Sequence, residues 1–211
     1  MKRQPHEKPI LIVIAGPNGS GKTSFAKQIL NHKWYKDCIF INPDEIALVK
    51  YGDWNSQDAV LKAAQYAEKV REKYLQKQQS LAFETVFSSP PKVDYVKRAI
   101  KAGFFVRLFF IGTDSPFINV NRVGLRVAEG GHSVPLQKIF PRYHKSLANL
   151  GSILQVVHRG YVYDNSFDYE FPKLQVRTEL GILKKTYQTN HDWAEQIRKY
   201  FKDSQQLNGQ I

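Results

Sequence analysis

Two patterns of apolar residues alternate along the chain. Apolar runs, continuous except for Arg107 and typical of strands buried on both faces of a parallel sheet, occur at 10–15, 38–41, 81–83 and 104–111. Apolar positions at helical spacing predict helices from about residue 22, over 56–79 and 92–102, from 115 to a break at 130–131, and over 135–150. Weaker signals predict short strands at 155–157, 161–163 and 174–177 and a last helix at 192–201. This alternation predicts an α/β fold with a mostly parallel sheet.

In such a sheet, ligands bind beyond the carboxyl ends of the strands. The first strand is followed by GPNGSGKT (16–23), which matches the phosphate-loop pattern G-x-x-x-x-G-K-[ST] at every defined position. Its backbone amides can surround phosphates, Lys22 can reach the β- and γ-phosphates, and the Thr23 hydroxyl can ligate Mg²⁺. The sequence therefore predicts that a nucleoside triphosphate binds to Gly16, Pro17, Asn18, Gly19, Ser20, Gly21, Lys22, Thr23 and Ser24.

Two other predicted strands end in carboxylates. Asp44 lies in NPDE (42–45), and Glu84 follows the strand at 81–83. At the same sheet edge as the phosphate loop, these groups suit phosphoryl transfer to a hydroxyl, in which one carboxylate accepts the hydroxyl proton. Helix capping or a solvated surface is the alternative for each residue alone. The phosphate loop favours the catalytic interpretation.

Basic residues gather in the segment after the last long strand. Arg122 and Arg126 are four residues apart, hence on one helix face, and His132 and Arg142 follow. Arginines that close over a triphosphate would stabilise the transition state of phosphoryl transfer, so this segment is a candidate helical lid. A solvated basic face is the alternative. His132 is not expected to ligate a metal, because no partner ligands lie at a useful spacing.

Two aromatic segments have simpler interpretations. YVYDNS (161–166) is a polar turn after a strand, which either caps the adenine pocket or is only a turn. The aromatic stripe in the strand at 104–111 is expected to be sheet core: Phe104, Phe105, Phe109 and Phe110.

Composition narrows the class of protein. The 211 residues are 42% hydrophobic and 24% charged, as in one ordinary globular domain. The single cysteine, Cys38, excludes a disulfide scaffold and is compatible with a reducing compartment. Neither a membrane span nor a secretory leader is evident, so a cytoplasmic protein is expected. The 31 Lys and Arg against 19 Asp and Glu give a net charge of +12, which suits polyanionic ligands or only solubility.

Five motifs then occur in a recognisable order: AGPNGSGKT (15–23), FINPDEI (40–46), FET (83–85), GGHSVP (130–135) and YDNS (163–166). Over residues 10–166 this set resembles the zeta toxin family, in particular its short bacterial branch. The resemblance implies a three-layer P-loop kinase fold with a helical lid. It also implies an ATP- or GTP-dependent, Mg²⁺-dependent kinase that phosphorylates the 3′-hydroxyl of UDP-N-acetylglucosamine.

Carried over by position, the resemblance gives roles to individual residues. Asp44 would be the general base, Lys22 and Thr23 the phosphate and Mg²⁺ contacts, and Arg126 the first lid arginine. The substrate-binding residues would be Glu68, Glu84 and Thr85. The second lid arginine has no direct counterpart, because His132 stands at its position, and the nearby candidates are Arg122 and Arg142.

The resemblance also predicts organisation and partners. We expect a basic extension at 1–9, a P-loop kinase domain at 10–170 and a strand and helix extension at 171–211 packed on the same domain. An antitoxin protein is an expected partner, and no N-terminal antitoxin domain is expected in this chain. Two alternatives remain at this point: a kinase of nucleic acid ends or of another nucleotide, and a non-catalytic nucleotide-binding regulatory module.

Overall fold

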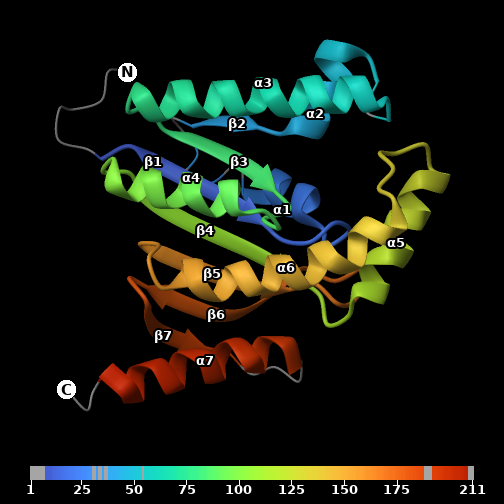
Figure 1. Ribbon diagram of the computed structural model, residues 1–211. Coiled ribbons are helices and arrows are strands. Elements are labelled where there is room, and N and C mark those ends of the chain that lie inside the picture. The colour runs from blue at the N-terminus through green and yellow to red at the C-terminus, as the bar shows by residue number, and fades with distance from the viewer. Residues whose placement is uncertain are drawn as a thin grey trace.

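The computed structural model describes residues 8–29, 32, 35, 38–53, 55–187 and 192–208, and in these ranges seven strands form one central sheet (Figure 1). The strands are β1 (Ile10–Ala15), β2 (Ile39–Ile41), β3 (Leu81–Thr85), β4 (Phe105–Gly112), β5 (Arg159–Asp164), β6 (Lys173–Glu179) and β7 (Ile182–Thr186). Their spatial order is β2-β3-β1-β4-β5-β6-β7. Strands β1 to β5 pair with one another in parallel. Strand β6 pairs antiparallel with β5 on one side and with β7 on the other. The predicted α/β fold with a mostly parallel sheet is confirmed.

Helices pack on both faces of the sheet (Figure 1). One face carries α3 (Gln57–Gln76), α4 (Pro90–Lys101), α6 (Leu136–Leu154) and α7 (Asp192–Asn208), and the other carries α1 (Lys22–Ile29). The remaining helices are α2 (Pro43–Tyr51), which follows β2, and α5 (Pro116–Ala128). Together with the start of α6, α5 projects beyond the carboxyl ends of the strands (Figure 1). We call α5, the 129–135 loop and the first turns of α6 the lid.

The apolar run of β1 explains the position of the core. Leu11, Val13 and Ala15 face the side that carries α3, α4, α6 and α7. Ile12 and Ile14 face the opposite side, where α1 packs. All five side chains are completely buried, as expected for a strand in the middle of a three-layer fold. The carboxyl end of β1, and with it the phosphate loop, is therefore held between two cores.

Two predictions of local structure are wrong or incomplete. Residues 155–157 form no strand, because α6 continues to Leu154 and a turn leads into β5. The apolar signal there comes from Val157, which is fully buried in the turn. The aromatic stripe is core at three positions, but Phe105 is only half-buried and packs against the ring of His158, with centroids 4.8 Å apart.

Two elements were not predicted at all: α2 and β7. Helix α2 begins where the β2 strand was expected to end, because the Asn42 side chain accepts a hydrogen bond from the Asp44 amide at 3.0 Å and Pro43 starts the first turn. Strand β7 is a largely exposed, lysine-containing edge strand, which carries little hydrophobic signal. No helix in the described ranges meets the length and hydropathy needed to cross a bilayer.

Candidate active site

The phosphate loop connects β1 to α1 and directs its lysine inward. Lys22 is the first residue of α1 and only 7% exposed, and its Nζ donates a hydrogen bond to the carbonyl of Pro17 at 2.8 Å. The Ser20 amide donates to the same carbonyl at 3.3 Å. The Ser20 hydroxyl is buried without a hydrogen-bond partner among the described residues. The loop therefore presents a positive, polar cradle of the kind that binds phosphate.

Glu84 lies beside this loop because β3 is the parallel neighbour of β1, with Glu84 in register with Ile14. The Thr23 hydroxyl donates to both carboxylate oxygens of Glu84, at 2.9 and 3.1 Å. Asn42 Nδ2 approaches Oε2 at 3.4 Å. Burial raises the pKa of Glu84, while Lys22 and the Thr23 hydrogen bond act in the opposite direction. A hydroxyl and a carboxylate thus meet at the edge of the phosphate loop.

Asp44 reaches the same edge from β2. It stands in the first turn of α2, where the Asn42 cap fixes the local backbone. Its side chain is 49% exposed, and Oδ1 lies 3.9 Å from Nε2 of His132. Asp44 is therefore held near the phosphate loop and remains accessible to a second substrate.

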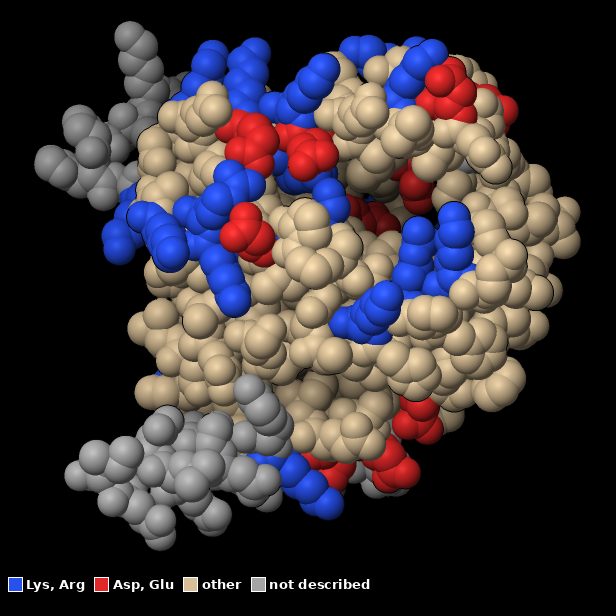
Figure 2. All heavy atoms as spheres, in the orientation of Figure 1, with Lys and Arg blue, Asp and Glu red and all other residues tan. Residues whose placement is uncertain are grey.

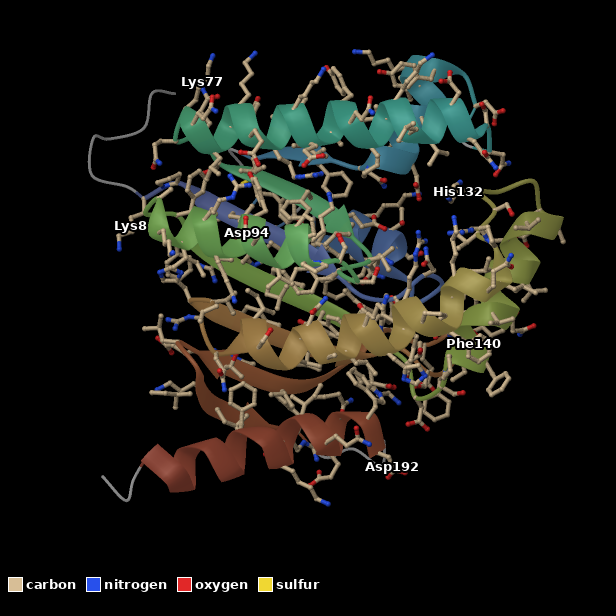
Figure 3. All side chains as sticks on the ribbon, viewed as in Figure 1. Lys8, Lys77, Asp94, His132, Phe140 and Asp192 are labelled. Atoms are coloured by element: carbon tan, nitrogen blue, oxygen red, sulfur yellow. The ribbon has the colours of Figure 1, made fainter. Side chains whose placement is uncertain are left out.

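Two arginines approach from the lid. Arg126, on α5, donates from Nη2 to the carbonyl of His132 at 2.7 Å. Arg142, on α6, donates from Nη1 to Oδ1 of Asn18 in the phosphate loop at 3.3 Å. The ring of Phe140 on α6 packs edge-on against Phe117 of α5, with centroids 5.2 Å apart (Figure 3). This contact joins the two helices that carry the arginines.

The charged groups converge electrostatically on Lys22. Burial lowers the pKa of Lys22, Glu84 and Asp44 raise it, and Arg126 and Arg142 lower it further. These four neighbours come from β3, α2, α5 and α6. The structure thus brings five of the predicted site residues to one place.

The lid loop spans the space between α5 and the α2–α3 side of the molecule. Figure 3 shows His132 where this loop approaches α2 and α3. The Ser133 amide donates to the Asn55 side chain at 2.8 Å. Together with the approach of His132 to Asp44, this hydrogen bond connects the lid loop to the α2–α3 side of the molecule. Figure 2 shows a hollow between α2–α3 and the lid, with acidic side chains inside it and basic side chains on the lid side.

One residue that joins the lid to the phosphate loop was not predicted from the sequence. Asn119 on α5 is completely buried, and its Nδ2 donates to the carbonyl of Asn18 at 2.6 Å. Its Oδ1 accepts a hydrogen bond from Thr113. The available signal was a polar residue four positions before buried Val123, hence on the apolar stripe of the helix. Such a side chain needs a specific partner.

Four other predicted residues make different contacts or are exposed. Arg122 is bound to Asp168 and to the carbonyl of Asn165, at 2.8 and 2.7 Å. Glu68 is exposed on α3, and no hydrogen bond or ion pair joins it to the Lys22 group in the described part of the chain. The Thr85 hydroxyl accepts from the Phe87 amide at 3.1 Å, and Ser24 is an exposed residue of α1.

Of the predicted polar turn at 161–166, residues 161–164 belong to strand β5, and the residues that follow are more than a connection. Asn165 Nδ2 donates to the carbonyl of Ser20 in the phosphate loop at 2.9 Å, and the Asn165 amide donates to the carbonyl of Gly112 at 2.8 Å. The turn therefore supports the side of the loop that leads into α1.

The donor set fits Mg²⁺ bound together with nucleotide phosphates. Over the residues that the structure describes, no three His, Cys, Asp or Glu side chains gather as a metal-binding group. Mg²⁺ is usually held by one or two protein oxygens, substrate phosphates and water. The Thr23 hydroxyl and the Glu84 carboxylate are such oxygens, and they lie side by side.

Comparisons with solved structures show the fold. A chain of the AvrRxo1-ORF1:-ORF2 complex with ATP matches with a TM-score of 0.66 at 17% identity, covering 93% of this chain and 64% of that one. The PezAT toxin–antitoxin system of Streptococcus pneumoniae matches with a TM-score of 0.61 at 15% identity, covering 98% and 89%. The Pnkp1/Rnl/Hen1 RNA repair complex matches with a TM-score of 0.55 at 17% identity, covering 90% and 53%. At these identities the likeness is one of fold, and this chain spans only 64% of the AvrRxo1 chain's length.

Comparison of sequences gives the family. No curated protein sequence matches the chain significantly. The family profile described as Zeta toxin matches residues 1–166, which is most of the 211 residues and includes all five motifs. The resemblance predicted from those motifs is confirmed, and the chain belongs to the zeta toxin family.

Proposed function

We propose that the chain is an ATP- and Mg²⁺-dependent kinase that phosphorylates a hydroxyl of a small-molecule acceptor, with a nucleotide sugar such as UDP-N-acetylglucosamine as that acceptor. The observation that carries the proposal is the convergence of Asp44, Glu84, Arg126 and Arg142 on the phosphate-loop lysine. These groups supply a base, a metal-side carboxylate and two cations, which is the set that phosphoryl transfer requires. Membership of the zeta toxin family supports the acceptor class.

The phosphate loop and its neighbours bind the nucleotide. The backbone amides of the loop and the start of α1 surround the phosphates, and Lys22 contacts the β- and γ-phosphates. Thr23 and Glu84 would hold Mg²⁺, and their mutual hydrogen bond supports this assignment. When bound, Mg²⁺ neutralises charge on the phosphate oxygens. In this proposal Glu84 contacts Mg²⁺ rather than the acceptor, and Glu68 and Thr85 remain as candidates for contacts with the acceptor.

Asp44 acts as the base. The acceptor oxygen forms a bond to the γ-phosphorus, the bond between that phosphorus and the bridging oxygen of ADP breaks, and the hydroxyl proton passes to the Asp44 carboxylate. Arg126 and Arg142 stabilise the charge on the moving phosphoryl group from the lid side. The partial exposure of Asp44 leaves room for the acceptor hydroxyl.

An inhibitory partner is part of the proposal. The PezAT structure is that of a toxin–antitoxin system, and the AvrRxo1 structure is that of a complex of ORF1 and ORF2. Because the chain belongs to the zeta toxin family and shares its fold with these proteins, we propose that an antitoxin protein binds it.

Mass spectrometry of the acceptor tests the proposal directly. Purified protein is incubated with ATP, Mg²⁺ and UDP-N-acetylglucosamine, and the expected product is heavier by one phosphoryl group. Asp44→Asn should reduce turnover by about 10²- to 10⁴-fold while it keeps ATP binding. ATP turnover without sugar phosphorylation would reject this acceptor but keep the kinase, and oligonucleotides with 5′-hydroxyl ends would be the next acceptors. ATP binding without any Asp44-dependent turnover would overturn the kinase assignment.

A further inference from the structure

The segment at 164–168, between β5 and β6, links parts of the molecule that are far apart in sequence. Through Asn165 it donates to the carbonyl of Ser20 in the phosphate loop, at 2.9 Å. Arg122 of the lid helix α5 binds it twice, at the carbonyl of Asn165 (2.7 Å) and at Oδ1 of Asp168 (2.8 Å). The position of this segment therefore affects both the nucleotide loop and the lid.

The shape of the segment is set by one buried carboxylate. Asp164 is 2% exposed and accepts hydrogen bonds from the Ser166 amide at 3.1 Å and the Ser166 hydroxyl at 2.6 Å. The Ser166 hydroxyl in turn accepts from the Asp114 amide at 2.8 Å, which ties the turn to the end of β4. A buried carboxylate must be satisfied by donors, so this arrangement is sensitive to the loss of any one of them.

A third donor to Asp164 comes from the C-terminal helix. The indole Nε1 of Trp193 donates to Asp164 Oδ1 at 2.9 Å, and the indole is only 5% exposed. Its ring packs against Phe110 and over Gly112, where any side chain would collide with it. Asp192 marks the start of α7 at the end of the sheet that carries the active site (Figure 3). Trp193 lies beyond the 1–166 range of the family match.

We propose that Trp193 is a positioning residue of the nucleotide site: its hydrogen bond to Asp164 holds the 164–168 segment against the phosphate loop and the lid helix, so α7 contributes to nucleotide affinity. The inference rests on the nucleotide binding in the proposed function, but it concerns residues outside the catalytic group. Without the indole donor, the buried Asp164 carboxylate would recruit water or shift, and Asn165 would move with it. Binding a nucleotide would then require the segment to be ordered again.

Calorimetry of a non-hydrolysable ATP analogue with Mg²⁺ tests the inference. Trp193→Phe keeps an aromatic ring near Phe110 but removes the N–H donor together with the outer part of the indole that packs over Gly112. It should weaken binding of the analogue by about tenfold. In steady-state assays the KM for ATP should rise while kcat changes little, since no group that contacts the phosphoryl centre is altered. By reciprocity, the analogue should slow hydrogen exchange across 192–201 in the wild type and less so in the variant.

A variant of the same helix separates positioning from packing. Phe201→Leu removes buried volume from α7 at a position away from Asp164, so it should lower stability without changing affinity for the analogue. If Trp193→Phe does not fold, Ser166→Ala tests the same turn from the other side and should also weaken binding. Equal affinity of Trp193→Phe and the wild type, well below both melting temperatures, would overturn the inference. A wild type that does not bind the analogue at all would instead overturn the proposed function.

Discussion

The phosphate loop carries Lys22 and the lid places Arg126 and Arg142 around it, but the two regions are built in different ways. The loop is one run of consecutive residues whose backbone groups and Lys22 are positioned by β1 and α1. The lid contributes two side chains from separate helices, and each donates a hydrogen bond to a neighbour: Arg126 to the His132 carbonyl and Arg142 to the Asn18 side chain. The loop is preorganised by local structure, whereas the lid depends on tertiary contacts.

The two regions meet at Asn119. The Asn119 side chain donates from Nδ2 to the Asn18 carbonyl, and Gly19 lies directly against the Asn119 backbone. A change at this junction therefore affects both regions. The difference implies that loop variants act mainly on nucleotide binding, whereas variants of Arg126 and Arg142 act mainly on the rate of transfer.

The largest effect is expected from the lid. Arg142→Met removes a cation that faces the phosphate loop, and kcat should fall by about 10³-fold while the KM for ATP changes much less. Arg122→Met is the matched variant, because Arg122 is tied to Asp168 and Asn165 instead. It should affect the KM for ATP more than kcat. Steady-state kinetics of both variants would contradict the lid assignment if Arg122→Met lost more of kcat than Arg142→Met.

The next largest effect is expected from the loop. Gly19 has φ +75°, and a Cβ there would lie 2.5 Å from the Asn119 carbonyl oxygen. Gly19→Ala should therefore displace the loop and weaken nucleotide binding by about 10²-fold. Gly52 has nearly the same backbone conformation, φ +78°, with nothing within 4 Å of its Cβ position. Gly52→Ala should destabilise the fold by only about 1 kcal/mol and leave nucleotide affinity unchanged, as titration and thermal melts would show.

The difference between the two regions also explains what could be predicted from the sequence. The phosphate loop is a contiguous pattern, and the parallel-sheet rule placed the carboxylates after β2 and β3 at the same edge, where Asp44 and Glu84 both affect Lys22. Both inferences need only local pattern and topology. The fold class followed from the same alternation of strands and helices.

The rest depended on partners that are distant in sequence. Arg122 and Arg126 share a helix face, so spacing could not tell that Arg122 binds Asp168 while Arg126 donates to the His132 carbonyl. Arg142 and Asn18 are 124 residues apart. The interaction of Trp193 with Asp164 likewise depends on how α7 folds back onto the sheet.

A smaller effect, on pH dependence, tests where Glu84 acts. Burial raises its pKa above the ordinary value, so its carboxylate becomes protonated at a higher pH than an exposed one. Activity should fall as the pH drops toward this raised pKa, and added Mg²⁺ should restore part of it. Glu84→Gln should be about tenfold less active at neutral pH. Its activity should no longer show the fall at low pH that added Mg²⁺ partly restores. If the variant showed the same fall of activity at low pH, a group other than Glu84 would be responsible for it.

The same shift has a consequence for stability. A folded-state pKa raised above the unfolded value means that the charged carboxylate destabilises the fold at neutral pH, and this effect disappears as the pH falls through the folded pKa. In the absence of Mg²⁺ and nucleotide, Glu84→Gln should therefore melt at a higher temperature than the wild type at pH 7. Thermal melts at pH 7 and at pH 4 check this, with the difference smaller at the lower pH.

The smallest effect concerns a half-buried lysine outside both regions. The pKa of Lys92, on α4, is lowered to about 8, chiefly by burial and also by nearby Arg71, while Glu68 acts in the opposite direction. Below about pH 8 the lysine is charged in both the folded and unfolded states, so the full penalty for burying the charge applies. Lys92→Met should then raise the free energy of unfolding by about 1 kcal/mol at pH 7. Between about pH 8 and 10.5 only the unfolded state stays protonated, so the advantage of the variant should shrink and then vanish. Urea unfolding across this range measures it, and an advantage independent of pH would mean that methionine acts by packing rather than by loss of charge.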